Sequence, residues 1–118
     1  MNIWENIDKL NQKVNNDNNE SLAQHIRYSH VITNKELLKD KKLTDKLRKL
    51  DYKELSGGFG AVLNYPDENP SKIVIAYDDN EPVGWISVTN GYQNIYVINK
   101  YRKTGVASKL KDIIYNRK

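Results

Sequence analysis

The segment that most constrains the fold is residues 94–110, which read NIYVINKYRKTGVASKL. Its first half is a short run of β-branched and aromatic residues, which predicts a strand. Its second half predicts a helix, and a basic turn with one glycine, Gly105, links the two. The first N–H groups of a helix have no partner inside the helix, and the helix dipole places partial positive charge beside them. This strand, turn and helix are therefore a candidate anion-binding site.

The residues of the turn support the same interpretation. Gly105 lets the backbone approach a phosphate with no Cβ in the way. Arg102 and Lys103 add full positive charges next to it. The alternative interpretation is an ordinary strand, turn and helix with a basic loop exposed to solvent.

The pattern V-x-x-x-x-R-x-x-G-V-A-x-x-L, from Val97 to Leu110, resembles the acyl-CoA-binding signature of the GNAT superfamily of N-acyltransferases. That signature is written R/Q-x-x-G-x-G/A, and Arg102, Gly105 and Ala107 occupy its three fixed positions. Its place between a strand and an amphipathic helix makes the resemblance more specific than the motif alone.

The resemblance implies a fold class and a site. The fold is α+β, with a mixed or antiparallel GNAT-like sheet, N-terminal helices and a C-terminal cofactor-binding helix. The co-substrate is acetyl-CoA, with its pyrophosphate on the turn and its pantetheine arm paired with the backbone of the preceding strand. The implied cofactor-binding residues are Val97, Ile98, Arg102, Lys103, Thr104, Gly105, Val106, Ala107 and Ser108.

The implied reaction transfers an acetyl group from acetyl-CoA to an amine: a protein lysine, an N-terminus or a small amine. The amine must be neutral to attack, so a base or a chain of waters must accept its proton. The oxyanion needs a donor, which the family provides as a backbone N–H of the signature strand, here near Val97 or Ile98. That strand has no Asp, Glu or His, so no base is identified. Tyr92, Tyr96 and Tyr115 are candidates by position alone.

The strand before the turn is the third of three consecutive strands. Residues 72–77 and 83–89 are the first two, and an Asn-Gly dipeptide, a strong hairpin signal, precedes a strand over residues 93–99. Three antiparallel strands followed by a helix resemble the central half of a GNAT domain. The resemblance covers residues 72–117 well, and residues 21–65 only by the order of elements.

The N-terminal region contains one clear helical pattern and one segment with two interpretations. Apolar residues recur over residues 3–14 at the spacing of an amphipathic helix, which favours a packing helix over a docking or dimerisation helix. Residues 21–32 fit either a short helix with a capping box at its start or a strand with Ile26, Tyr28 and Ile32 on one side.

Further along, Thr33 and Glu36 form a capping-box pattern that predicts a helix, and residues 44–50 predict another. Lysines and arginines there alternate with aspartates, which favours the solvated side of a helix over a nucleic-acid-binding patch. The glycine-rich residues 56–60 lack the ending of a nucleotide-binding loop. They are interpreted as a turn before a strand over residues 61–65, with a loop beside the substrate cleft as the alternative.

A length of 118 residues suits one domain. We expect a single GNAT-like domain, with a helix and polar loop in residues 1–20, a helical half in residues 21–71, and the sheet, turn and cofactor helix in residues 72–118. The absence of cysteine excludes disulfides and thiol catalysis, and the two histidines lack the spacing of a metal pair, so no metal site is expected. The net charge of +4 suits a polyanionic co-substrate.

No apolar run reaches the length of a membrane span and no signal-peptide core is present, so no membrane partner and a cytoplasmic location are expected. The heavy use of Asn and Lys is typical of an AT-rich genome, that of a phage or a low-GC bacterium.

The sequence departs from the resemblance at its C-terminal end. A GNAT domain continues beyond the cofactor helix with a strand, a helix and a hairpin, whereas this sequence stops there. We expect a homodimer or a partner complex that completes the sheet, since an uncovered sheet edge recruits another chain. The alternatives are that the strand over residues 61–65 moves in, or that the fold is minimal.

Two classes of function follow. One is the GNAT-type N-acetyltransferase. The other is a non-catalytic GNAT-like binding or inhibitory module, for example a phage protein that acts on a host protein. Nucleic-acid binding is a third and weaker class, since it rests on charge alone.

Overall fold

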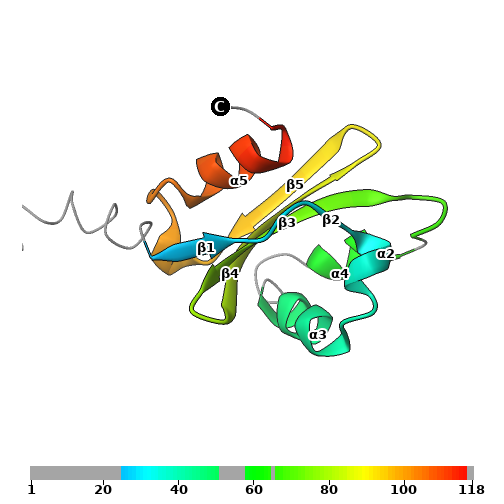
Figure 1. The fold of residues 1–118 in the computed structure, drawn as a ribbon, viewed down its shortest axis with the longest axis horizontal. Helices are drawn as coiled ribbons and strands as arrows, with labels where there is room; N and C mark the ends of the chain where they lie inside the picture. Colours follow the sequence, from blue (N-terminus) through cyan, green and yellow to red (C-terminus); the bar gives the residue numbers. More distant parts are fainter. Residues whose placement is uncertain (1–24, 51–57, 65, 117–118) are drawn as a thin grey trace, which may run out of the picture.

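The computed structural model describes residues 25–50, 58–64 and 66–116, which form an antiparallel sheet with helices on both faces (Figure 1). The helix predicted over residues 3–14 lies outside the described residues. In chain order, the elements are β1 (Ile26–Tyr28), β2 (Ile32–Thr33), α2 (Asn34–Leu37), α3 (Lys41–Leu50), α4 (Gly58–Val62), β3 (Ser71–Asp78), β4 (Glu81–Thr89), β5 (Tyr92–Val97), the 3-10 helix η1 (Asn99–Tyr101) and α5 (Val106–Ile114).

The sheet is built on three long strands that follow one another as hairpins. β3 pairs with β4 and β4 with β5, while the short β1 and β2 both pair with the other edge of β3. Asn90 and Gly91 close the β4–β5 hairpin with φ values of 51° and 83°, the left-handed pair that a two-residue hairpin favours. The three predicted strands are confirmed. β5 ends at Val97 instead of Asn99, because the chain turns into η1.

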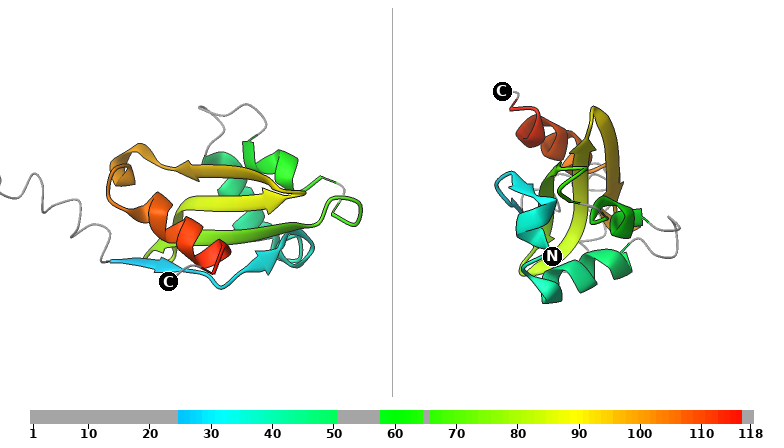
Figure 2. Two further views of the ribbon diagram at one scale, coloured as in Figure 1. Left: turned by 90° about the horizontal axis from the view of Figure 1, so that it is seen from above. Right: turned by 90° about the vertical axis from the view of Figure 1, so that its right-hand side faces the viewer.

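β3 is buried on both faces, as its unbroken apolar run indicates. Val74 and Ala76 belong to one core cluster, which includes the apolar side of α5. Ile73 and Ile75 point the other way, into a second cluster with α2, α3 and α4. The structure therefore has three layers, with α5 on one face of the sheet and α2, α3 and α4 on the other (Figure 2).

The strand predicted over residues 61–65 is wrong, because the chain up to Val62 belongs to helix α4. The sequence pattern also predicts a turn over residues 56–60, but Gly58 and Gly60 lie in the same helix. The helix forms because Phe59, Val62 and Leu63 have the i, i+3, i+4 spacing of a helical face, and all three are buried. Their burial against the sheet rules out the idea that this segment supplies an edge strand.

Residues 21–32 follow the strand interpretation over β1 and β2. The chain leaves the sheet between the two strands, so Ile32 packs in the cluster opposite to that of Ile26 and Tyr28. The prediction that the three side chains share one side is therefore wrong. The first residues of this segment lie outside the described part of the chain.

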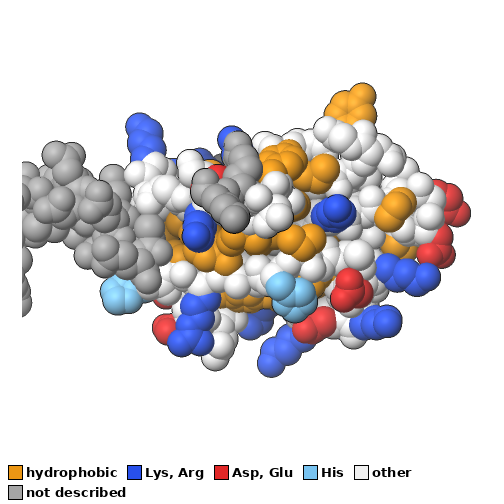
Figure 3. All heavy atoms as spheres, turned by 45° about the horizontal axis from the view of Figure 1, so that its top comes forward, with side chains coloured by type: hydrophobic (Ala, Val, Ile, Leu, Met, Phe, Trp, Pro, Cys, Tyr) orange, Lys and Arg blue, Asp and Glu red, His pale blue; other side chains and the backbone are white. Residues whose placement is uncertain are grey.

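The two helices predicted after β2 are present. Thr33 and Glu36 form the predicted capping box at the start of α2. α3 begins at Lys41, before the predicted start, because the carboxylate of Asp40 accepts the N–H of Leu43 at 3.1 Å and so caps the first turn. In Figure 3 the basic side chains are scattered over the visible face and interspersed with acidic ones, without a continuous basic patch.

Candidate functional site

β5 leads the chain into the predicted turn, and it is the last strand of the described sheet, so its outer edge is uncovered within the described residues (Figure 1). Successive residues of an antiparallel strand point their backbone groups alternately toward and away from the neighbouring strand. The N–H of Ile98 donates to the carbonyl of Val83 at 2.9 Å. The backbone of Val97 therefore faces the open edge. Of the two N–H groups considered as oxyanion donors, only that of Val97 is then a candidate.

The turn after η1 has a left-handed backbone at two residues. Lys103 has a φ of 63° and Gly105 a φ of 93°. Glycine adopts this conformation without the strain of a side chain, and nothing lies within 4 Å of the place where a Cβ on Gly105 would stand. The backbone at Gly105 is therefore open to close approach by a ligand.

α5 begins directly at this glycine, which occupies its N-cap position. The first hydrogen bond of the helix runs from the N–H of Lys109 to the carbonyl of Gly105 at 3.0 Å. The N–H groups of residues 106–108 consequently have no partner inside the helix, and they point out of its N-terminal end. These groups and the helix dipole favour an anion there.

Tyr101 holds the turn in place, and its ring is buried in the core cluster between α5 and the sheet. Its hydroxyl donates to the carboxylate of Asp78 at the end of β3, and its carbonyl accepts the hydroxyl of Thr104. The hydrogen bond to Asp78, burial and the negative charges of Asp78 and Asp79 together raise the pKa of Tyr101 to about 12. Tyr101 is therefore a structural donor that stays protonated at neutral pH.

Arg102 folds back along β5. Its Nε donates to the carbonyl of Val97 at 2.8 Å, and its guanidinium carbon lies 5.5 Å from the centre of the Tyr96 ring. This position keeps a full positive charge between the open strand edge and the turn. Arg102 and Lys103 are both exposed, so an anion can reach them from solvent.

The predicted site residues form one continuous strand, turn and helix, but most side chains do not face a ligand. Val106 is fully buried, and Thr104 is buried with its hydroxyl turned to Tyr101. Ala107 is half-buried and Ser108 is exposed. What Val106, Ala107 and Ser108 offer is therefore their backbone N–H groups, while the positive charge of the turn comes from Arg102 and Lys103.

The three tyrosines considered as catalytic groups occupy different environments. Tyr92 is 78% exposed at the tip of the β4–β5 hairpin, whereas Tyr96 is buried in the cluster below Arg102. Tyr115 follows α5 and donates to the Oε1 of Gln93 at 2.7 Å. The structure does not bring these tyrosines together, and it does not identify a base.

A polar pocket lies at the opposite end of β5, and the sequence interpretation missed it. It has a volume of about 320 Å³. Its lining residues come from the end of α4 and the residues after it, and from β3, β4 and β5: Ala61, Val62, Asn64, Asn69, Ser71, Thr89 and Asn94. No short motif marks these residues, because they meet only through the pairing of three strands.

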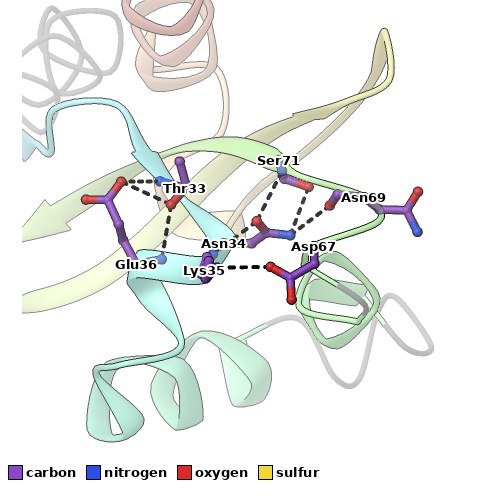
Figure 4. A network of polar contacts seen from close by, with 7 residues as sticks. All are labelled: Thr33, Asn34, Lys35, Glu36, Asp67, Asn69 and Ser71. Carbon is purple, nitrogen blue, oxygen red and sulfur yellow. Dashed lines mark hydrogen bonds and ion pairs between the residues drawn. The ribbon is translucent and has the colours of Figure 1, made fainter.

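Asn34, at the start of α2, fixes one wall of this pocket (Figure 4). Its side chain is fully buried, and its Nδ2 donates to the carbonyls of Val62 and Asn69, each at 3.0 Å. Its Oδ1 accepts the N–H groups of Ser71 at 3.2 Å and of Lys35 at 3.0 Å. One neutral amide thus joins α2, α4, the loop before β3 and the start of β3.

The described residues contain no group of three or more His, Asp or Glu side chains that could hold a metal ion. No helix in the described ranges is long and apolar enough to cross a membrane.

The fold and the turn define a class: an α+β protein in which a strand meander passes through a glycine turn into a helix whose first amides have no partner inside the helix. The chain matches the Acetyltransferase (GNAT) family model over residues 37–114, from the end of α2 to the end of α5. It therefore belongs to that family, which confirms the resemblance and the fold class. No curated protein and no solved structure gives a significant match.

Proposed function

We propose that this protein is an N-acetyltransferase that transfers an acetyl group from acetyl-CoA to an amine. The observation that supports this most is the turn at Gly105, where left-handed backbone opens α5 and leaves three amides beside Arg102 and Lys103. A diphosphate needs both hydrogen-bond donors and positive charge, and this turn offers both. The backbone groups along the open edge of β5 offer donors and acceptors to the amides of the pantetheine arm.

In the proposed reaction, the neutral amine attacks the thioester carbon and forms a C–N bond. The carbonyl oxygen becomes an oxyanion, which the N–H of Val97 is positioned to stabilise from the strand edge. The C–S bond then breaks, coenzyme A leaves as a thiolate, and the proton lost by the amine neutralises it. We assign no side chain to that proton transfer, so a chain of waters is the proposed route.

The test consists of two measurements on the full chain, one of acetyl-CoA binding and one of acetyl transfer. Calorimetric titration with acetyl-CoA should give saturable binding, and release of free thiol, with intact-mass analysis of the amine, should reveal transfer. A candidate panel of a lysine peptide, a free peptide N-terminus and small amines covers the acceptor classes. If acetyl-CoA does not bind at millimolar concentration, the proposed function is wrong.

A second candidate is a GNAT-like binding module without turnover. It is favoured by the composition of β5 and η1, which carry no Asp, Glu or His to act as a base. It is also favoured by Arg102, which occupies the outward carbonyl of Val97 with its own Nε. Saturable acetyl-CoA binding without thiol release for any amine of the panel would support this candidate over the enzyme.

The open edge of β5 also supports an assembly in which a second copy or a partner protein extends the sheet. Unpaired N–H and C=O groups along a strand edge favour pairing with another chain. Size-exclusion chromatography with light scattering would give a dimer mass if the partner is a second copy. A monomer mass at tens of micromolar would contradict the homodimer.

A further inference from the structure

We infer that the polar pocket at the start of β5 binds an amine that carries uncharged hydroxyl or carboxamide groups. That this amine is the acetyl acceptor rests on the proposed function, but the chemistry of the pocket does not. The pocket volume of about 320 Å³ lies at the lower end of the range for small-molecule sites, which suits one amino sugar or one short amino-acid amide.

The lining of the pocket decides the chemical class of the ligand. Every described residue that lines it is uncharged, and five of these seven residues carry a hydroxyl or a carboxamide. The nearby carboxylate of Asp67 is exposed and already paired with Lys35 at 3.0 Å. Beyond the amino group that reaches toward the acetyl donor, any further charged group in the pocket would lose water without gaining an opposite charge. Hydroxyl and amide groups would instead find matching partners.

Two other surface hollows among the described residues have charged side chains in their linings, and they provide a comparison. One is lined by Asp40, Lys42 and Lys46 beside Tyr77, and another by His25, Arg27 and two aspartates. Charged side chains therefore line both of these hollows. Their absence from the described lining of the pocket beside Asn94 distinguishes that pocket from both.

The pocket is also held rigidly, which a binding site needs if it is to select by hydrogen bonds. Asn34 fixes the backbone at Asn69 and Ser71 (Figure 4), and it also fixes the backbone at Val62, so it holds three of the lining residues. The hydroxyl of Ser71 is also hydrogen-bonded to that of Thr89 across the β3–β4 pair. The donors and acceptors of this wall therefore have defined positions before a ligand arrives.

An unpaired hydroxyl lies next to the pocket. Ser87 is fully buried, and its Oγ has no hydrogen-bond partner among the described residues. On β4 it shares a face with Thr89, and on β5 it lies directly opposite Asn94, so both of its neighbours line the pocket. A buried polar group without a partner is unfavourable, and it calls for an explanation. A ligand that moves Asn94 aside and pairs with Ser87 is that explanation.

The place of the pocket along β5 connects it with the turn. Asn94 lines the pocket, and Val97 presents its backbone at the open edge before the turn. Three residues of strand span about 10 Å. A molecule anchored at Gly105 and extended along β5 would therefore reach toward the pocket, which is the relation that an acyl donor and its acceptor require.

The experiment measures direct binding to the full chain without acetyl-CoA, by calorimetry or ligand-observed NMR. The probes are two matched pairs: glucosamine with cyclohexylamine, and serinamide with sec-butylamine, and spermidine serves as the polycation. We expect glucosamine or serinamide to bind at least tenfold more tightly than its apolar match and than spermidine. Equal binding within both pairs, tighter binding of spermidine, or no binding of glucosamine and serinamide would overturn the inference.

Variants place the binding in the pocket. Asn94→Leu should weaken binding of the favoured probe at least tenfold, whereas Asn80→Leu, an exposed asparagine in the β3–β4 turn, should leave it unchanged. Ser87→Ala should weaken binding about threefold without lowering the unfolding temperature, because the hydroxyl that it removes is unpaired in the free protein. Unchanged binding in both pocket variants would overturn the inference.

A separate titration with acetyl-CoA distinguishes the two proposals. Acetyl-CoA binding without any pocket binding would leave the proposed function standing and overturn this inference. Pocket binding without acetyl-CoA binding would leave this inference standing and overturn the proposed function.

Discussion

The two ends of β5 carry different chemistry on the same strand. At its start, near Asn94, the described residues that line the pocket are uncharged, and a buried amide, Asn34, holds them in place through hydrogen bonds to backbone. At its end, the turn has left-handed backbone, two exposed cations and an ionisable anchor, the pair of Tyr101 and Asp78. The two ends of β5 therefore suit different ligand groups. The turn after its end suits a polyanion, and the pocket near Asn94 suits neutral polar groups.

The two ends should also respond differently to solution conditions. Hydrogen bonds among neutral groups change little with salt or with pH, whereas charges on an exposed surface are screened by salt. Variants at the start of β5 should therefore alter stability and neutral-ligand binding. Variants at its end should alter anion binding and pH dependence.

The largest effect should come from Asn34→Ala. The substitution leaves a buried N–H and two backbone carbonyls without their partner, and we expect a loss of about 3 kcal/mol in the free energy of unfolding. Urea denaturation measures it. The loss should be the same at pH 7 and pH 9 and at low and high salt.

Asn34→Ala has a matched control in Asn80→Ala, since Asn80 is exposed and should change stability by less than about 0.5 kcal/mol. A loss below about 1 kcal/mol for Asn34→Ala would show that the amide does not hold the start of β5.

The next largest effect should come from changes at two glycines. Gly91 lies in the hairpin before β5, and Gly105 caps α5. Gly91 and Gly105 both have a positive φ, and neither has an atom within 4 Å of an added Cβ. Each change to alanine should therefore cost a similar strain of about 1 kcal/mol. Gly105→Ala should in addition weaken acetyl-CoA binding about tenfold or more, equivalent to about 1.4 kcal/mol, because the methyl group stands where the diphosphate approaches. Calorimetric titration of both variants measures it, and an equal loss of affinity would remove the turn from the site.

A smaller effect should follow from Tyr101→Phe, which removes the hydrogen bond to Asp78. We expect a loss of about 1 kcal/mol in unfolding free energy at neutral pH. The folded pKa of about 12 lies above the ordinary value of 10.0, so the contribution is full below pH 10 and disappears as the pH rises toward 12.

The difference in stability between wild type and Tyr101→Phe, measured by urea denaturation from pH 7 to pH 11.5, should therefore shrink above pH 10. A difference that is constant over this range would mean that the phenol is not coupled to the carboxylate. Tyr101→Phe would then resemble Asn34→Ala, whose loss of stability is expected to be independent of pH.

The smallest effect should come from Arg102→Lys, which keeps the charge but replaces the planar guanidinium that donates to Val97. We expect acetyl-CoA to bind about threefold more weakly, since one geometric contact is lost while the electrostatic attraction persists. Arg48→Lys, an exposed change on α3, is the control and should bind as wild type does. Stronger salt dependence in Arg48→Lys than in Arg102→Lys would contradict the placement of the anion.

The C-terminal half was predictable because its signals are local. The Asn-Gly dipeptide fixes the hairpin before β5, and the capping residue Gly105 fixes the start of α5. Short-range rules describe both well, because the residues involved are neighbours in the chain. The family signature adds to this, since it occupies one unbroken segment.

The other half depends on contacts between distant residues. A short apolar run such as residues 61–65 does not separate a strand from a helix, and only the burial of Phe59 against Trp85 decides for α4. Apart from the adjacent Lys35, the partners of Asn34 lie 28 to 37 residues away, so no sequence motif indicates them. The pocket could not be predicted for the same reason, whereas the turn could.

One consequence of the packing on β4 is optical. Trp85 is 1% exposed, its indole meets the ring of Phe59 edge-on, and its Nε1 has no hydrogen-bond partner among the described residues. An indole shielded from water in this way fluoresces at short wavelength. Ser87 follows two residues later on the same face of the strand, so a ligand that reaches it disturbs the neighbourhood of this fluorophore. In a Trp4→Phe background, Trp85 would be the single tryptophan of the chain and a label-free reporter of ligand arrival.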